Sequence, residues 1–189
     1  HGWSPAGPLA RQNTCDFIPT PLAQKEIEIF KANTTGKPNN MSMHMHWARL
    51  IETLHAAEMI KELLDDPDIL EGELVRKGNK TIEGVGLIEA PRGSLGHWIK
   101  VKDAKIERYQ IITPTAWNAS PRDSSGERGP WEQAMVGTEI KNQDNPVEVD
   151  HIIRSFDPCL VCTVHAIDIR KSGRFGSIRA GGNPRPLIL

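Results

Sequence analysis

The sequence predicts an α+β fold that is mainly helical and contains a small antiparallel β region. Residues 42–64 contain neither Gly nor Pro, and their apolar side chains recur at spacings of three and four residues, which predicts a long helix. Short β-type runs follow between residues 85 and 112, and the polar segment 102–105 is suited to a hairpin turn. With 189 residues, of which 38% are hydrophobic, the chain is long enough to bury one core.

The rest of the chain is expected to consist of shorter helices and loops. A short helix is expected over residues 22–32, and further helices are expected near residues 131–140 and 146–155, the last with a proline in its first turn. Residues 1–21 and 114–130 are expected to be loops because prolines and glycines interrupt them.

Composition and charge exclude several classes of protein. The formal net charge is -1, which gives no reason to expect a nucleic-acid partner, and no apolar run approaches the roughly 18–20 residues that span a bilayer. The 16 Gly and 14 Pro predict much irregular loop that needs packing against other structure. The chain begins at His1 with no recognisable signal segment, so we expect a piece of a larger protein.

A C-x-x-C pair followed by a histidine is the strongest chemical motif. Cys159, Cys162 and His165 carry it, and thiolates are soft ligands suited to nickel, zinc, copper(I) or iron–sulfur centres. A redox dithiol or half of a zinc site would show similar spacing, so the spacing alone leaves the chemistry open. The third cysteine, Cys15, stands alone and is interpreted as a small, partly buried apolar residue.

Two further segments are rich in groups that can bind an anionic ligand. Arg92 lies between Pro91 and Gly93 at the end of a β-type run, so the backbone is expected to orient its side chain. A surface turn with a solvated arginine is the alternative. Residues 113–123, which include Thr115, are dense in hydroxyl and amide groups that can donate hydrogen bonds.

Together, these three motifs closely resemble the large subunit of nickel–iron hydrogenases. They are, in chain order, Ala90-Pro91-Arg92-Gly93, Pro114-Thr115-x-Trp117-Asn118 and Asp157-Pro158-Cys159-x-x-Cys162-x-x-His165. Gly7-Pro8-Leu9-Ala10-Arg11 also fits the family, and residues 93–98 and 161–165 are most similar to its uptake-type branch. The resemblance covers nearly the whole chain and implies the C-terminal part of the large-subunit fold, in an unprocessed precursor form.

The resemblance implies a nickel–iron centre whose iron carries carbonyl and cyanide ligands. Cys159 matches the cysteine that binds nickel terminally, and Cys162 matches the cysteine that bridges nickel and iron. Pro91 and Thr115 match the pocket around the diatomic ligands, and the Thr115 hydroxyl is expected to donate a hydrogen bond to a cyanide.

The resemblance also implies which residues act on dihydrogen. Arg92 matches an arginine that is suspended over the open coordination site and is a candidate base, and Asp157 matches a carboxylate that holds this arginine in place. Because a guanidinium stays protonated in water, a thiolate ligand such as Cys162, or the terminal Cys159, is a rival proton acceptor. Arg92, Asp157 and Cys159 are therefore the expected catalytic residues.

The same resemblance implies that the chain consists of a mature part and an extension that is removed. Residues 1–165 are expected to be the mature part, because His165 matches the residue after which a maturation protease cuts. In the mature family that histidine binds a magnesium ion, and Ile111 is expected to lend its backbone carbonyl to the same ion. Residues 166–189 carry five basic residues against one acidic residue, and we expect this extension to be poorly ordered by itself and removed on maturation.

The family's centre takes four thiolates, and this chain supplies only the C-terminal pair. We therefore expect the isolated chain to be inactive. Its expected partners are the remainder of the large subunit, an iron–sulfur small subunit, a maturation protease, nickel-insertion proteins and dihydrogen. The expected location is cytoplasmic, with membrane association through a partner as an alternative.

Two other functions stay open. In the first, the chain is a non-enzymatic accessory or interaction protein derived from that subunit, which binds a single metal through Cys159, Cys162 and His165. In the second, it is a dithiol redox protein. A thioredoxin-like site would follow a β-strand, whereas residues 147–155 are expected to be helical, which argues against this second alternative.

Overall fold

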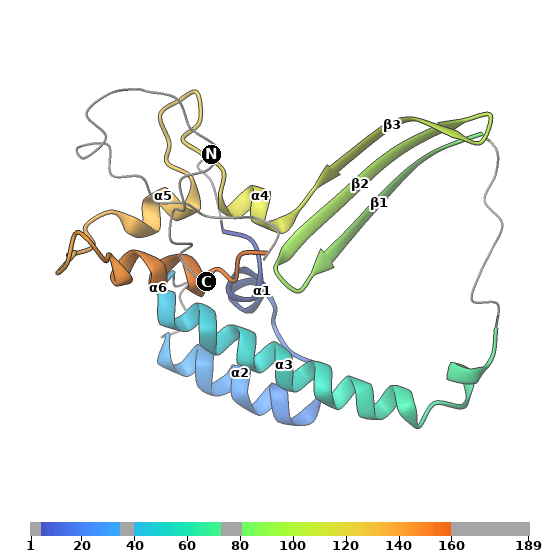
Figure 1. The fold of residues 1–189 in the computed structure, drawn as a ribbon. Helices are drawn as coiled ribbons and strands as arrows, with labels where there is room; N and C mark the ends of the chain where they lie inside the picture. The colour runs from blue at the N-terminus through green and yellow to red at the C-terminus, as the bar shows by residue number, and fades with distance from the viewer. Residues whose placement is uncertain (1–4, 35–39, 73–80, 160–189) are drawn as a thin grey trace.

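The computed structural model describes residues 5–34, 40–72 and 81–159, and it combines a helical body with a three-stranded sheet (Figure 1). The sheet projects from the body, and its inner end lies beside the short helices α1 (Pro8–Thr14) and α4 (Pro114–Asn118) (Figure 1). The predicted α+β class, mainly helical with a small antiparallel β region, is confirmed. No helix within these described residues combines the length and apolarity needed to cross a bilayer.

Helices α2 (Pro21–Asn33) and α3 (Ser42–Leu64) pack against each other and carry most of the core, which confirms both predicted helices. The ring of the buried Phe30 meets the ring of Trp47 edge to face, with 5.2 Å between the ring centres. The core is completed by Leu9, Ile18, Ala23, Ile27, Met45, Ala48, Ile51 and Phe156. No residue of 52–64 is buried, so the fully buried residues of α3 lie in its first half, and Leu54 beyond them packs against the core while partly buried.

Prolines begin helices in this chain, and the predicted loops over 1–21 and 114–130 are wrong in part for that reason, whereas residues 15–20 and 119–129 are loops as predicted. Helix α1 begins at Pro8 and helix α4 begins at Pro114, each inside a segment expected to be a loop. A proline fits the first helical position because its φ is already helical and the N–H that it lacks would have no partner there. The same residue that breaks a helix interior therefore starts these two helices.

Three strands form an antiparallel meander in the order β1-β2-β3. Their bounds are β1 (Ile82–Ala90), β2 (Gly93–Lys102) and β3 (Lys105–Ile112). At the outer end, Asp103 and Ala104 have φ values of 50° and 60°, as a two-residue hairpin turn requires. The predicted hairpin at residues 102–105 is confirmed.

The inner end of the sheet carries the turn between β1 and β2. Ala90 pairs with Gly93, so Pro91 and Arg92 form the two-residue turn. Gly93 has a φ of 128°, which a residue with a side chain rarely adopts. This turn faces the helical body, where α1 approaches it (Figure 1).

Three further helices complete the described part of the chain. They are the 3₁₀ helix η1 (Pro67–Leu70), α5 (Pro130–Met135) and α6 (Val147–Ser155). The predicted helix near 146–155 is confirmed, whereas α5 is shorter than expected and ends before Gly137, which has a φ of 82°. Helix α6 packs on α3 and α5, and the chain that leaves it carries Asp157 and Cys159.

Candidate metal centre

Arg92 is paired with Asp157, although 65 residues separate the two in the chain. The Arg92 Nε atom donates to the Asp157 backbone carbonyl at 2.8 Å and lies 3.1 Å from the carboxylate Oδ2. Its Nη2 atom donates to Oδ1 at 3.3 Å. The guanidinium is thus held by the backbone and the side chain of one residue, and it is not a freely solvated surface arginine.

The backbone at the end of α6 puts Asp157 in position for this pairing. Asp157 has a φ of 53° and its N–H donates to the Arg154 carbonyl at 2.9 Å. This left-handed conformation ends the helix, and aspartate adopts it more readily than most residues. The proline that follows, Pro158, cannot continue the helix, so the chain leaves α6 here and leads directly to Cys159.

Arg49 of α3 is a second arginine at the same carboxylate. Its Nε atom lies 3.5 Å from Asp157 Oδ2, and its Nη2 atom donates to the Ser155 carbonyl at 2.9 Å. Burial lowers the pKa of Arg49 against the attraction of Asp157, and the positive charge of Arg92 lowers it further. One carboxylate therefore serves two guanidinium groups.

Arg49 lies outside the motifs that the sequence singles out. The signal that could have found it is its position on α3, between the buried Ala48 and Ile51, where a solvated arginine is unexpected. Glu52 lies three residues later on the same face and is also mostly covered. Charged residues within the buried stripe of a helix indicate partners on neighbouring elements.

Arg11 of α1 binds the backbone of the turn that carries Arg92. Its Nε and Nη2 atoms donate to the two carboxylate oxygens of Glu52 at 2.8 and 2.6 Å. Its Nη1 atom donates to Glu89 Oε2 at 2.8 Å and to the Ala90 carbonyl at 3.0 Å, and Nη2 also reaches the Pro91 carbonyl at 2.9 Å. The motif that contains Arg11 was matched to the family, but no role was predicted for this residue.

Charge around Arg11 shifts two pKa values. Burial alone would lower the pKa of Arg11, but the hydrogen bonds and negative charges of Glu52 and Glu89 raise it overall. Burial would raise the pKa of Glu89, but hydrogen bonds from Ser94 and Arg11 lower it overall. Both groups are therefore charged at neutral pH, as their ion pair requires.

Cys159 lies beside Thr115 of α4. The Cys159 backbone N–H donates to the Thr115 hydroxyl oxygen at 3.3 Å, and Thr115 is buried. The hydroxyl still has its own hydrogen to donate, as the predicted contact with a cyanide requires. Helix α4 is anchored by Asn118, whose side-chain amide exchanges two hydrogen bonds with the backbone of Ala6 at 2.9 and 3.1 Å.

Comparison with known proteins identifies the chain. The sequence model of the nickel-dependent hydrogenases matches residues 5–165. The chain belongs to the nickel-dependent hydrogenase family. The resemblance noted in the sequence is thus confirmed.

Relatives of several kinds share this family membership. The NAD-reducing hydrogenase HoxS subunit beta of Cupriavidus necator is 40% identical over 175 residues, which are 85% of this chain and 34% of that protein. An uptake hydrogenase large subunit of Rhodobacter capsulatus is 50% identical over 88 residues, or 47% of this chain and 15% of that protein. A NiFeSe hydrogenase variant of Desulfovibrio vulgaris Hildenborough has a similar structure, with a TM-score of 0.69 and 37% identity over 85% of this chain and 35% of that chain. Where a relative aligns with most of this chain, the aligned part makes up about a third of that relative's length.

Several residues expected at the hydrogenase centre lie outside the described residues. They are Cys162, His165 and the extension 166–189. Ile111 lies near the inner end of β3, and its carbonyl accepts a hydrogen bond from the Gln110 side chain at 3.1 Å. Within residues 5–34, 40–72 and 81–159, no three His, Cys, Asp or Glu side chains are grouped to hold a metal ion. Cys159 is the predicted thiolate ligand that the described part contains.

Cys15 fits its interpretation as a small, partly buried apolar residue. It is partly buried and packs against the core, and burial raises the pKa of its thiol, an effect that Lys31 only partly opposes. A raised pKa keeps the thiol protonated at neutral pH, and the thiolate is the form that binds metals.

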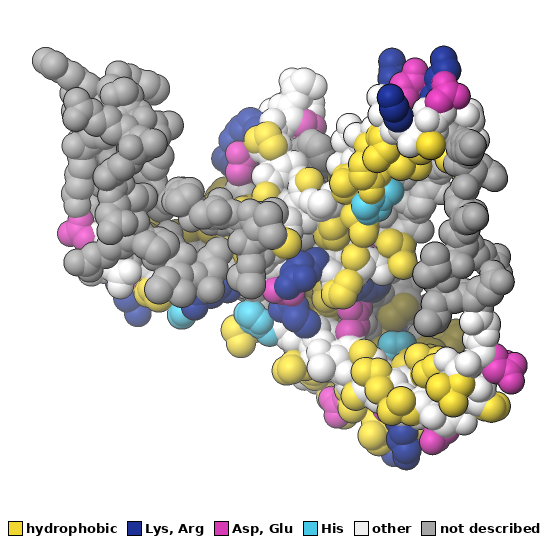
Figure 2. Space-filling view, turned by 45° about the vertical axis from the view of Figure 1, so that its right-hand side comes forward, with side chains coloured by type: hydrophobic (Ala, Val, Ile, Leu, Met, Phe, Trp, Pro, Cys, Tyr) yellow, Lys and Arg dark blue, Asp and Glu magenta, His cyan; other side chains and the backbone are white. Residues whose placement is uncertain are grey.

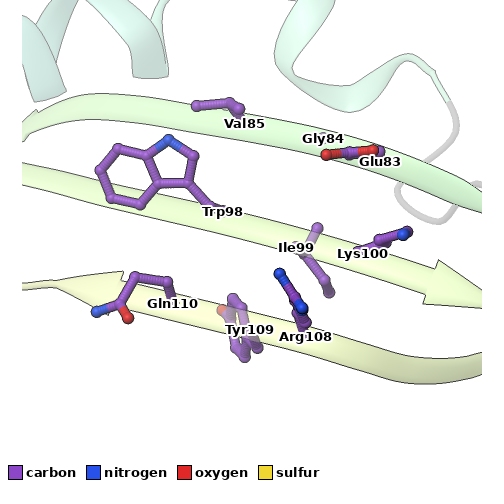
Figure 3. A pocket seen from close by; sticks show the side chains of 9 residues that line it. All are labelled: Glu83, Gly84, Val85, Trp98, Ile99, Lys100, Arg108, Tyr109 and Gln110. Atoms are coloured by element: carbon purple, nitrogen blue, oxygen red, sulfur yellow. The ribbon is translucent and has the colours of Figure 1, made fainter.

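A shallow hollow on the projecting sheet does not coincide with the predicted centre. Figure 3 shows side chains from all three strands along it, with Trp98 and Gln110 toward one end and Lys100 toward the other. Its lining consists of Glu83, Gly84, Val85, Trp98, Ile99, Lys100, Arg108, Tyr109 and Gln110. None of the predicted ligand or catalytic residues borders it.

Gly7 is expected to tolerate no side chain, because it touches the Arg92 turn. Gly7 has a φ of 118°, and a Cβ atom there would lie 2.8 Å from the Arg92 carbonyl oxygen. We expect Gly7→Ala to lower the free energy of unfolding by about 1–3 kcal/mol more than Gly72→Ala does. Gly72 is the matched control because its φ is 104° but no atom lies within 4 Å of its Cβ position. Urea unfolding of both variants measures the difference, and equal losses would show that the close approach costs nothing.

Proposed function

We propose that this chain is the C-terminal part of the catalytic large subunit of a nickel–iron hydrogenase, and that it takes part in cleaving dihydrogen reversibly into protons and electrons. The observation that carries the proposal is the Arg92–Asp157 pair in a member of the nickel-dependent hydrogenase family. Asp157 precedes Cys159 by two residues. A cation that is fixed by the segment that carries a thiolate ligand suits a reaction that separates charge.

The donor atoms of the chain fit half of a nickel–iron centre. Cys159 is a free, partly buried cysteine, and its thiolate is the soft ligand that nickel prefers. We propose that Cys159 and Cys162 hold the centre, with its carbonyl and cyanide ligands, together with two thiolates from the remainder of the subunit. When bound, the centre supplies a Lewis acid for dihydrogen. Magnesium is proposed at His165 with the Ile111 carbonyl, which can accept a second interaction besides that from Gln110.

The residues of this chain would orient the reaction and move its proton. Arg92 carries a guanidinium cation with N–H donors and no acceptor, so it stabilises negative charge and orients the ligand pocket. The thiolate of Cys159 has a lone pair that can take up a proton, which a guanidinium lacks, so Cys159 accepts the proton in this proposal. Asp157 fixes the Arg92 guanidinium, and the buried Thr115 hydroxyl fixes the Cys159 backbone while its own hydrogen is available to a cyanide.

The remainder of the large subunit is the proposed partner of the sheet. Val85, Leu87 and Ile88 of β1 are 61%, 71% and 64% exposed, and the neighbours Leu87 and Ile88 point to opposite faces. Figure 2 shows hydrophobic side chains along the sheet and over the helices below it. A sheet that is apolar on both faces is normally covered on both. The matched part of this chain makes up only about a third of the length of these relatives, which supports the proposal that the remainder covers these faces.

An iron–sulfur small subunit, a maturation protease and nickel-insertion proteins complete the proposed set of partners. The small subunit would carry the electrons away from the centre. The family match reaches residue 165 and stops there, which supports the proposal that residues 1–165 are the mature part and 166–189 a removable extension.

Co-expression tests the proposal. The chain would be produced with a polypeptide that carries the other C-x-x-C pair and with the maturation proteins, and we call the product the assembled subunit. We expect nickel in the assembled subunit, the infrared bands of iron-bound carbonyl and cyanide, and an intact mass that lacks residues 166–189. Absence of the infrared bands would refute the enzyme and favour an accessory protein that binds one metal. A full-length mass with nickel in place would refute the removal of the extension.

A further inference from the structure

We propose that Arg11 is a positioning residue that holds the Arg92 turn in place for dihydrogen cleavage, an inference that rests on the proposed function. Arg11 lies on α1, and it reaches the two residues that precede Arg92 in the chain. Its role is to fix the backbone from which the Arg92 side chain projects.

Arg11 supplies hydrogen bonds to the carbonyls of this turn, in which only one of the two turn residues, Arg92, has a backbone N–H. The ladder between β1 and β2 ends at the Ala90–Gly93 pair, and Pro91 has no N–H. The carbonyls of Ala90 and Pro91 accept hydrogen bonds from Arg11 Nη1 and Nη2 at 3.0 and 2.9 Å. On the next residue, the Arg92 carbonyl lies against Gly7, so α1 and its N-cap contact three consecutive residues of the chain.

Arg11 is itself held by a rigid element. Glu52 of α3 accepts two hydrogen bonds from the Arg11 guanidinium, at 2.8 and 2.6 Å, in the bidentate geometry that arginine favours. Arg49 lies one turn earlier on α3 and contacts Asp157, the partner of Arg92. One helix thus holds both sides of the Arg92–Asp157 pair, through Arg11 on the turn and through Arg49 on the carboxylate.

Lysine at position 11 would preserve the charge but not the geometry. The guanidinium of Arg11 makes five hydrogen bonds from three nitrogen atoms, to two carboxylates and two carbonyls. An ammonium group has three donors on one atom and cannot reach all four partners. Arg11→Lys therefore tests the position of the turn with little change in net charge.

The decisive experiment compares Arg11→Lys with Arg128→Lys in the assembled subunit. Arg128 is exposed, lies in the loop before α5, and undergoes the same chemical change. The rate of hydrogen–deuterium exchange between dihydrogen and heavy water is measured per nickel atom. We expect Arg11→Lys to lower this rate by about tenfold and to leave the nickel content and the infrared bands unchanged. We expect Arg128→Lys to leave the rate, the nickel content and the infrared bands unchanged.

A double variant separates positioning from general support of the fold. If Arg11 acts through Arg92, then Arg11→Lys causes no further loss when Arg92 is already replaced by lysine. An unchanged rate per nickel in Arg11→Lys, or an equal loss in the Arg92→Lys background, would overturn the proposal. If Arg11→Lys does not assemble, Gly7→Ala displaces the same turn and replaces it in the cycle, with Gly72→Ala as its control.

A second measurement keeps this inference distinct from the proposed function. Amide hydrogen exchange of the segment 89–94 is followed in the assembled subunit with and without Arg11→Lys. Faster exchange there, with unchanged exchange in α2, is expected whether or not the assembled subunit turns over dihydrogen. An inactive wild type would refute the function, and unchanged exchange in 89–94 would refute the role of Arg11.

Discussion

Replacing Cys159 with serine is expected to remove nickel from the assembled subunit. A serine hydroxyl is a hard and neutral ligand at pH 7, whereas the proposed centre depends on soft thiolates. The substitution is nearly isosteric, and the Cys159 backbone N–H keeps its hydrogen bond to Thr115, so the local fold is preserved. We expect the nickel content to fall to background and turnover to disappear with it.

The control for this prediction is the other described cysteine. Cys15→Ser makes the same chemical change at a thiol that packs against the core. Elemental analysis and infrared spectra of both variants are compared with those of the wild type. Nickel in Cys159→Ser at the wild-type level, or equal loss in both variants, would contradict the assignment of Cys159 as a ligand.

Asp157→Asn is expected to lower the exchange rate per nickel by about 100-fold, because the Arg92 guanidinium loses its anchoring charge. In the structure, one carboxylate lies 3.1 Å from Arg92 and 3.5 Å from Arg49. A neutral amide leaves these two cations side by side without compensation, and their repulsion displaces the Arg92 side chain. Nickel content is expected to stay unchanged because Asp157 is not a proposed ligand.

Asp65→Asn provides the matched control for this second prediction. Asp65 is exposed at the end of α3, far along that helix from Arg49, and the same carboxylate becomes the same amide. The control is expected to exchange at the wild-type rate. A wild-type rate in Asp157→Asn would show that the Arg92–Asp157 pair is not needed for the reaction. Loss of nickel in Asp157→Asn would show that this residue supports the metal and not only the arginine.

Local patterns in the sequence predicted the regular elements well. The apolar spacing of residues 42–64 gave helix α3 with its observed bounds, and the polar residues 102–105 gave the outer hairpin. The prolines at 8 and 114 predict loops but begin helices, because the sequence does not show whether a proline stands at the start of a helix or in a loop. That choice depends on whether the following residues find an apolar surface, as Leu9 does in the core.

The sequence by itself determined the family, the order of the elements and the motifs that contain Arg92, Thr115, Asp157 and Cys159. Motifs of this kind are local, so they can be recognised without knowing how the chain folds. Only the tertiary structure decided which charged groups meet. Arg11 reaches the Pro91 carbonyl across 80 residues, and Arg49 reaches the Ser155 carbonyl across 106. Such partners are set by the packing of α1, α3 and α6 around one core, and no spacing within the sequence encodes that packing.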